Sequence, residues 1–297
     1  MNPLTEPQIA VDVYRKRRER VLAALRANGG GVAIVPTAPE ALRNRDADYP
    51  YRHDSYFYYL TGFTEPEALL VLDASAGPDA PASILFCRAK NVEREIWEGF
   101  RFGPEGAREA FGFDAAFAFD EIDAQLPRVI ANRPALHYAL GASAALDGQV
   151  RGWLEAVRAQ GRSGGSAPAA IHDLLPVLDE MRLFKDAHEL AIMRRAGRIS
   201  AEAHRRAMAA CRPGVREYEL EAELLYTFRK HGAQAPAYGS IVAAGANACV
   251  LHYPAGSAIA QENDLILIDA ACELEGYASD ITRTFPASGK FTPAQRE

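Results

Sequence analysis

The chain lacks the features that mark secreted and disulfide-rich proteins. Its four cysteines lie far apart in 297 residues and form no Cys-x-x-Cys pair: Cys87, Cys211, Cys249 and Cys272. Neither a disulfide framework nor a zinc site with that spacing is therefore expected. The opening segment Met1–Pro7 contains no basic stretch followed by an apolar one, which argues against a secretory signal. These absences predict a cytoplasmic protein with free thiols.

Long apolar runs and an excess of positive charge are also missing. The apolar stretch Ile241–Leu251 is too short and too rich in glycine and asparagine to span a bilayer. The formal charge of −6 and the isoelectric point near 5.7 predict no basic surface for nucleic acid. With 48% hydrophobic residues, the chain can bury a sizeable core, and its length suits two domains. We therefore expect a globular protein with neither a membrane nor a nucleic-acid partner.

The first half alternates helical and strand patterns, which is typical of an α/β domain with a mixed or parallel sheet. Helices are expected at residues 9–27 and 148–160, and strands at residues 32–35, 68–72, 83–87 and 137–140. The run Gly161–Pro168 is the clearest flexible segment before the second half. We place the boundary near residue 178, which gives domains of residues 1–178 and 179–297.

The second domain opens with a strong helix signal. Asp186 is placed to cap the first turn, and Glu189 follows three residues later, as a capping box requires. The run Arg212-Pro213-Gly214 ends this helix, and a second helix is expected over Glu217–His231.

Two aspartates lie on the two arms of a predicted hairpin near the end of the chain. Residues 265–269 and 277–285 have strand composition and are joined by a short turn. A two-residue turn at Leu274-Glu275 places Asp269 directly opposite Asp280, whereas a turn at Glu275-Gly276 makes the two aspartates diagonal neighbours on one face. In either register the like charges repel unless a proton or a cation lies between them.

The aspartate pair favours a site for divalent ions, because such ions prefer oxygen ligands and two of them about 3.5–4 Å apart activate a water molecule. Two solvated aspartates at a hairpin end remain the plain alternative, and the spacing alone does not decide between them. His252 is, taken alone, more typical of a structural side chain. Trp97 is interpreted as core packing in preference to the edge of a subunit or site.

These residues belong to longer runs that resemble a known family. Residues 269–286, with Leu251-His252-Tyr253 upstream, resemble the catalytic domain of the Xaa-Pro aminopeptidases (aminopeptidase P), which are pita-bread metallopeptidases. The run Tyr51–Ala68 resembles the N-terminal domain of aminopeptidase P, and Met181–Lys185 resembles the entry to its catalytic domain. The resemblance implies an α/β N-terminal domain followed by the first part of an α+β pita-bread catalytic domain.

The resemblance also implies an activity and a ligand set. The expected enzyme is a metal-dependent hydrolase that releases the N-terminal residue from peptides with proline at the second position. By resemblance, Asp269 and Asp280 are metal ligands in a site for two divalent ions, usually Mn²⁺, and His252 is a catalytic residue that lines the substrate site. The family commonly assembles through its N-terminal domain, so a homo-oligomer, dimer or tetramer, is expected.

The family's other metal ligands, one histidine and two glutamates, come from motifs that this chain does not reach. Thr292 and Pro293 look like the cap and first position of a helix that Glu297 cuts short. We therefore expect a C-terminally truncated chain that is inactive by itself. The alternatives are a prolidase acting on Xaa-Pro dipeptides, a metal-free creatinase-type hydrolase and a non-catalytic pita-bread binding protein; the two aspartates argue against the last two.

Overall fold

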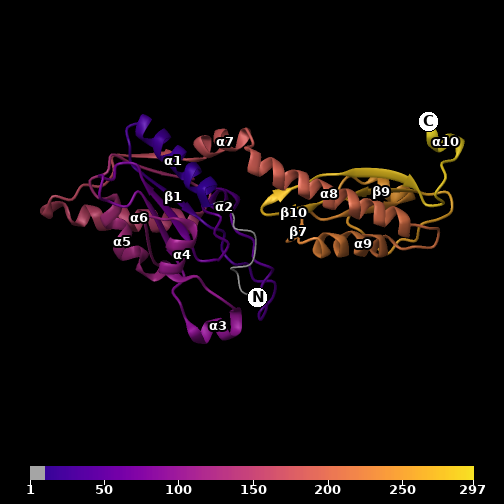
Figure 1. The fold of residues 1–297 in the computed structure, drawn as a ribbon, viewed down its shortest axis with the longest axis horizontal. Coiled ribbons are helices and arrows are strands. Elements are labelled where there is room, and N and C mark those ends of the chain that lie inside the picture. The colour runs from indigo at the N-terminus through magenta and orange to yellow at the C-terminus, as the bar shows by residue number, and fades with distance from the viewer. Residues whose placement is uncertain (1–10) are drawn as a thin grey trace. The chain divides into compact units, whose positions relative to one another are not determined.

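The computed structural model describes residues 11–297, so Met1–Pro7, where no secretory signal is expected, lies outside the described residues. The chain divides into two compact units, Met1–Phe184 and Lys185–Glu297, each of which is described by itself (Figure 1). No helix in the described part of the chain has both the length and the apolar character needed to cross a membrane.

The first unit is built on a six-stranded mixed sheet with the order β4-β3-β2-β1-β5-β6. The pairs β1–β2 and β2–β3 are antiparallel, and the pairs β3–β4, β1–β5 and β5–β6 are parallel. The strands are β1 (Val32–Pro36), β2 (Leu69–Asp73), β3 (Ser83–Cys87), β4 (Ala115–Ala118), β5 (Ala135–Tyr138) and β6 (Ala170–Asp173). The helices are α1 (Val11–Ala27), α2 (Ser55–Thr61), α3 (Val92–Glu98), α4 (Gly103–Phe111), α5 (Ile122–Ile130), α6 (Ala144–Ala159) and α7 (Leu175–Leu183), with short 3₁₀ turns η2 (Phe119–Glu121) and η3 (Gly161–Ser163).

The central strands bury both of their faces. In β1, Ala33 and Val35 pack in the core layer that includes α1, α2 and α7, whereas Val32 and Ile34 pack in the layer that includes α5 and α6. Successive side chains of a strand point to opposite faces, so a strand buried on both sides appears in the sequence as a continuous apolar run. The predicted α/β domain with a mixed sheet is therefore what these residues form.

The first unit ends a few residues after the domain boundary expected near residue 178. Leu178 and Met181 of α7 are buried in the core of the first unit, so this unit extends to Phe184. The run Gly161–Pro168 is an internal loop, because β6 follows it and forms the edge strand of the same sheet. A glycine-rich composition does not distinguish a surface loop within a domain from a linker between domains.

The interpretation of Trp97 as a core residue is wrong, because the structure exposes this side chain. It lies on α3, which has no buried residue, and 86% of its surface is exposed. Val92 and Ile96 on the same helix are also exposed. The helix is held at its ends by the Asn91 side chain, which accepts the Arg94 N–H, and by Gly99. Burial of an apolar side chain thus has no part in forming α3.

The second unit packs two helices, α8 (Ala187–Ala210) and α9 (Glu217–Lys230), against two small sheets. The sheets have the orders β11-β10-β7 and β12-β9-β8. Their strands are β7 (Ala235–Pro236), β8 (Ile241–Ala244), β9 (Leu265–Asp269), β10 (Cys272–Leu274), β11 (Tyr277–Ala278) and β12 (Thr282–Pro286), with η4 (Gly245–Cys249) and α10 (Pro293–Arg296). Helix α8 begins with the predicted capping box, in which the side chains of Asp186 and Glu189 each accept the other's N–H at 2.8 Å. Thr292 caps α10, also as predicted.

The hairpin adopts the second of the two predicted registers. Leu274 pairs with Tyr277, which leaves Glu275 and Gly276 as the turn residues. Both have positive φ values, 50° and 77°, as a type I′ turn requires. Further along the same two arms, Asp269 pairs with Thr282. Asp280 is therefore the diagonal neighbour of Asp269.

Candidate functional site

The two predicted metal ligands meet at one tyrosine hydroxyl. The Tyr238 Oη lies 2.5 Å from Asp269 Oδ1 and 3.0 Å from Asp280 Oδ1. Asp269 ends β9 and is half-buried, whereas Asp280 lies just before β12 and is exposed. The structure therefore brings the two carboxylates together, at the solvent-facing edge of the hairpin.

The position of Tyr238 follows from the short strand that precedes it. Strand β7 pairs with β10, and the chain continues alongside the hairpin, where the Ala237 N–H donates to Ala271 O at 2.8 Å. Strand β8 then joins the hairpin again, with Ile241 opposite Asp269. Tyr238 lies between these two attachments, so its side chain reaches the aspartates from the neighbouring segment.

The charges of this cluster are incompletely balanced. A tyrosine hydroxyl has one hydrogen atom, so it can donate a hydrogen bond to only one carboxylate at a time. Burial and the two carboxylates raise the pKa of Tyr238, so that proton stays in place at neutral pH. Neither Asp269 nor Asp280 has an ion pair with Lys, Arg or His within residues 11–297. Two adjacent carboxylates with a single shared donor favour the binding of a cation.

A buried histidine supports the backbone next to Asp269. His204 of α8 is buried, and its Nε2 lies 2.9 Å from the carbonyl oxygen of Ala270. Burial lowers the pKa of His204, so the ring is neutral at pH 7 and donates from Nε2 to the carbonyl. This contact ties the strand that carries Asp269 to the helix layer.

His252 lies on a loop that a buried carboxylate organises. Glu217, at the start of α9, is only 2% exposed. Its Oε1 accepts the Ala244 N–H at 2.8 Å and the Asn247 amide at 3.0 Å. Its Oε2 accepts the Tyr253 hydroxyl at 2.9 Å and the Gly256 N–H at 3.1 Å. Four donors from one loop thus converge on one side chain, which fixes residues 244–256 to α9.

His252 itself is exposed and makes no hydrogen bond to either aspartate among the described residues. The structure therefore unites Asp269 with Asp280 but leaves His252 on a separate, well-anchored loop. Sequence reasoning missed Tyr238 and Glu217. For Glu217 the sequence held a local clue, since an acidic residue in the first turn of a helix is a capping candidate. For Tyr238 it held none, because the contacts of this residue depend on strand pairing between segments far apart in the chain.

The donor set fits part of a site for a hard divalent ion. Carboxylate oxygens are the ligands that Mg²⁺, Mn²⁺ and Ca²⁺ prefer. Residues 11–297 contain no group of three or more histidine, cysteine, aspartate or glutamate side chains arranged to hold a metal. Asp269 and Asp280 therefore supply two ligands, and a complete coordination sphere needs others.

Two parts of the chain match the models of known protein families. Residues 14–137 match the model of the aminopeptidase P N-terminal domain, and residues 191–297 match that of metallopeptidase family M24. The chain thus combines an aminopeptidase P N-terminal domain with an M24 metallopeptidase region. The chain is 46% identical over 290 residues to the Xaa-Pro aminopeptidase of Escherichia coli (strain K12). This match covers 98% of this chain and 65% of that relative.

Solved structures of aminopeptidases show the same fold. The Pseudomonas aeruginosa aminopeptidase PepP matches with 49% identity and a TM-score of 0.93, over 97% of this chain and 64% of that one. Zinc-substituted Escherichia coli aminopeptidase P, in complex with product, matches with 44% identity and a TM-score of 0.92, over 98% and 65%. The predicted fold class is confirmed. The chain spans about 65% of the length of the curated Escherichia coli relative.

Proposed function

We propose that the protein to which this chain corresponds is a metal-dependent aminopeptidase that releases the N-terminal residue from peptides with proline at the second position. The observation that carries the proposal is the convergence of Asp269 and Asp280 on the Tyr238 hydroxyl. The relatives named Xaa-Pro aminopeptidase support the choice of substrate. Proline leaves the scissile bond without an N–H and restricts the residue before it, which favours a dedicated enzyme.

Asp269 and Asp280 would hold two divalent ions, for which Mn²⁺ is the proposed metal. Such ions, when bound, lower the pKa of a water molecule and stabilise negative charge on the attacked oxygen. The chain's own residues orient this site: the Tyr238 hydroxyl donates a hydrogen bond to the aspartate pair, and His204 holds the backbone beside Asp269. His252, on the loop anchored by Glu217, would contact the peptide substrate.

We infer that the 297-residue chain is inactive by itself, because the two aspartates are too few to complete a dinuclear site. The absence of a third ligand next to them in residues 11–297 supports this inference. We also infer a cytoplasmic location, in line with cysteines that form no disulfide in the described part of the chain.

We infer, finally, that the protein self-associates through its N-terminal domain. The exposed apolar residues of α3, which include Val92, Ile96 and Trp97, support an interface there, because apolar residues gathered on a surface mark interaction sites. A monomeric mass by light scattering of the full-length protein would refute this inference.

Metal binding by the aspartates is measurable without catalysis. A Mn²⁺ titration of this chain, monitored by the electron paramagnetic resonance of free Mn²⁺, should show weak binding that Asp280→Asn reduces by at least about tenfold. Glu262→Gln, which removes an exposed carboxylate of the same unit, is the matched control and should bind as the wild type does. Equal binding by all three proteins would remove the support for a metal site at the aspartates.

A further inference from the structure

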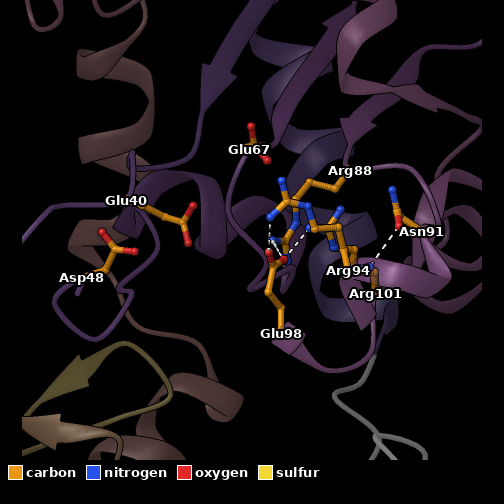
Figure 2. A pocket seen from close by; sticks show the side chains of 8 residues that line it. All are labelled: Glu40, Asp48, Glu67, Arg88, Asn91, Arg94, Glu98 and Arg101. Carbon is orange, nitrogen blue, oxygen red and sulfur yellow. Dashed lines mark hydrogen bonds and ion pairs between the residues drawn. The ribbon is translucent and has the colours of Figure 1, made fainter. Parts of the chain in front are cut away.

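The first unit contains a polar pocket that the proposed function does not use. Its volume is about 420 Å³, within the range of small-molecule sites. It is lined by basic and acidic side chains from separate segments of the chain. Figure 2 shows three guanidinium groups gathered around one glutamate, with Glu40 and Asp48 on the other side of the pocket.

The basic wall consists of Arg88, Arg94 and Arg101 around the carboxylate of Glu98. Arg88 and Arg94 each place an Nη1 atom 3.5 Å from a Glu98 oxygen, and Arg101 donates to the same carboxylate. Arg88 also forms an ion pair with Glu65, so three guanidinium groups face two carboxylates, those of Glu98 and Glu65. This wall has positive charge to offer to a ligand carboxylate, which arginine side chains bind with parallel N–H donors.

Two of the three arginines of the basic wall, Arg88 and Arg101, are fixed in place from behind, whereas the Arg94 side chain is 66% exposed. The side chains of Arg88 and Arg101 are only 13% and 12% exposed. Glu65 accepts the Phe102 N–H at 2.8 Å and lies 3.7 Å from Arg88. Because these side chains are held before any ligand arrives, binding to them costs little conformational entropy.

We call the lining residues Glu40, Asp48 and Glu67 the acidic wall; Figure 2 shows Glu40 and Asp48 together and Glu67 apart from them. None of the three has an ion pair with a basic side chain within residues 11–297. Glu67 also has a backbone φ of 51°, in the left-handed region that non-glycine residues seldom adopt. Strained residues of this kind cluster at ligand-binding sites. This wall offers negative charge to an ammonium group.

We propose that this pocket binds a small zwitterion, namely a free amino acid or short peptide. Its carboxylate would contact Arg88, Arg94 and Arg101, and its ammonium group would contact Glu40, Asp48 and Glu67. A simple anion is disfavoured by the acidic wall, and a simple cation by the basic wall, so the arrangement selects for a ligand that carries both charges. The inference concerns the first unit alone and requires no metal.

The test uses calorimetric titration of the 297-residue chain with L-alanine and L-alanyl-L-alanine. The dipeptide contains no proline, so it is not a substrate under the proposed function. Binding should weaken about tenfold when either end of the better ligand is blocked, by N-acetylation or by C-amidation, since each block removes one charged contact. The probe that binds more tightly shows whether the pocket prefers a free amino acid or a short peptide.

Variants assign the binding to the two walls. Glu67→Gln and Arg94→Gln should each weaken binding by about threefold or more, as expected for exposed charged contacts. Glu109→Gln and Arg151→Gln, on exposed positions of α4 and α6 outside the pocket, should bind like the wild type. Thermal unfolding midpoints equal to wild type verify that the variants are folded.

Three results would overturn the proposal: no binding of either probe, equal affinity for blocked and free ligands, or tighter binding of inorganic phosphate. Asp280→Asn should leave the binding unchanged, because it lies in the other unit. Loss of zwitterion binding therefore does not affect the metallopeptidase proposal, and failure of that proposal does not affect this one.

Discussion

At the scale of single residues, Tyr238 shows how one hydroxyl organises two acidic groups. The hydroxyl contacts both Asp269 and Asp280, and it is the hydrogen-bond donor that the two carboxylates share. Removing it leaves two like charges without that donor. Without metal, the pair therefore depends on Tyr238 to reduce its repulsion.

Tyr238→Phe should lower the free energy of unfolding of the metal-free chain by about 1–3 kcal/mol, the usual cost of losing a hydrogen bond to a charged group. Urea denaturation followed by far-UV circular dichroism measures this change. Tyr218→Phe, at an exposed tyrosine of α9, is the control and should leave the free energy unchanged. Equal effects of the two substitutions would show that the Tyr238 hydroxyl does not stabilise the cluster.

His137 provides a residue-scale prediction about pH in the first unit. The side chain is buried, and its Nε2 lies 3.0 Å from Gly30 O. Burial lowers the pKa of His137 below its ordinary value of 6.5, and the nearby His172 lowers it further. The unfolded chain therefore binds a proton more readily than the folded one, and this stability, present above pH 6.5, is lost as the pH falls.

His137→Asn should flatten the pH dependence of unfolding between about pH 7 and pH 5, relative to wild type. Tryptophan fluorescence is a suitable probe, because both tryptophans, Trp97 and Trp153, belong to the first unit. His231→Asn, at an exposed position of the second unit, serves as the control. Parallel curves for wild type and His137→Asn would contradict the prediction.

At the scale of elements, the loop that carries His252 depends on Glu217. Glu217→Gln replaces one acceptor oxygen with an NH₂ donor that faces other donors, so at least one buried hydrogen bond is lost. We expect the free energy of unfolding to fall by about 2–3 kcal/mol and amide exchange over residues 244–256 to accelerate. Hydrogen-exchange mass spectrometry measures the second effect directly.

Glu221→Gln, one turn further along α9, is the matched control, since Glu221 has no hydrogen-bond partner among the described residues. It should leave exchange over residues 244–256 at the wild-type rate. If Glu217→Gln also left that rate unchanged, Glu217 would not be what anchors the His252 loop.

The elements also show how far sequence reasoning extends. Local composition predicted both arms of the hairpin and limited its register to two choices, of which the structure adopts the one with Glu275-Gly276 in the turn. The preference of type I′ turns for glycine at a position with positive φ explains this choice. Tyr238 was beyond reach, because its position depends on the pairing of β7 with β10, more than thirty residues later.

Exposure was the least predictable property. Trp97 belongs to a residue type that is usually buried, yet α3 lies outside the core. The boundary near 178 had a similar cause, because the sequence does not show which core buries Leu178. Both properties arise from tertiary packing, which a pattern of local residues does not encode.

At the scale of the whole molecule, the two units carry separate chemistry. The first unit holds the two-walled pocket, and the second holds the aspartate pair. The family match covers both, while the chain spans about 65% of its Escherichia coli relative. The central proposal is that Asp269 and Asp280 form part of a metal-dependent peptidase site.

The most direct test is Mn²⁺-dependent hydrolysis of the tripeptide Ala-Pro-Ala, comparing this chain with a version extended to the natural stop codon of its gene. We predict activity only in the extended protein, its loss on addition of a chelator, and its loss in the extended Asp280→Asn variant. Hydrolysis of the dipeptide Ala-Pro but not of Ala-Pro-Ala would indicate a prolidase instead. Activity in neither protein, or activity that survives Asp280→Asn, would contradict the account.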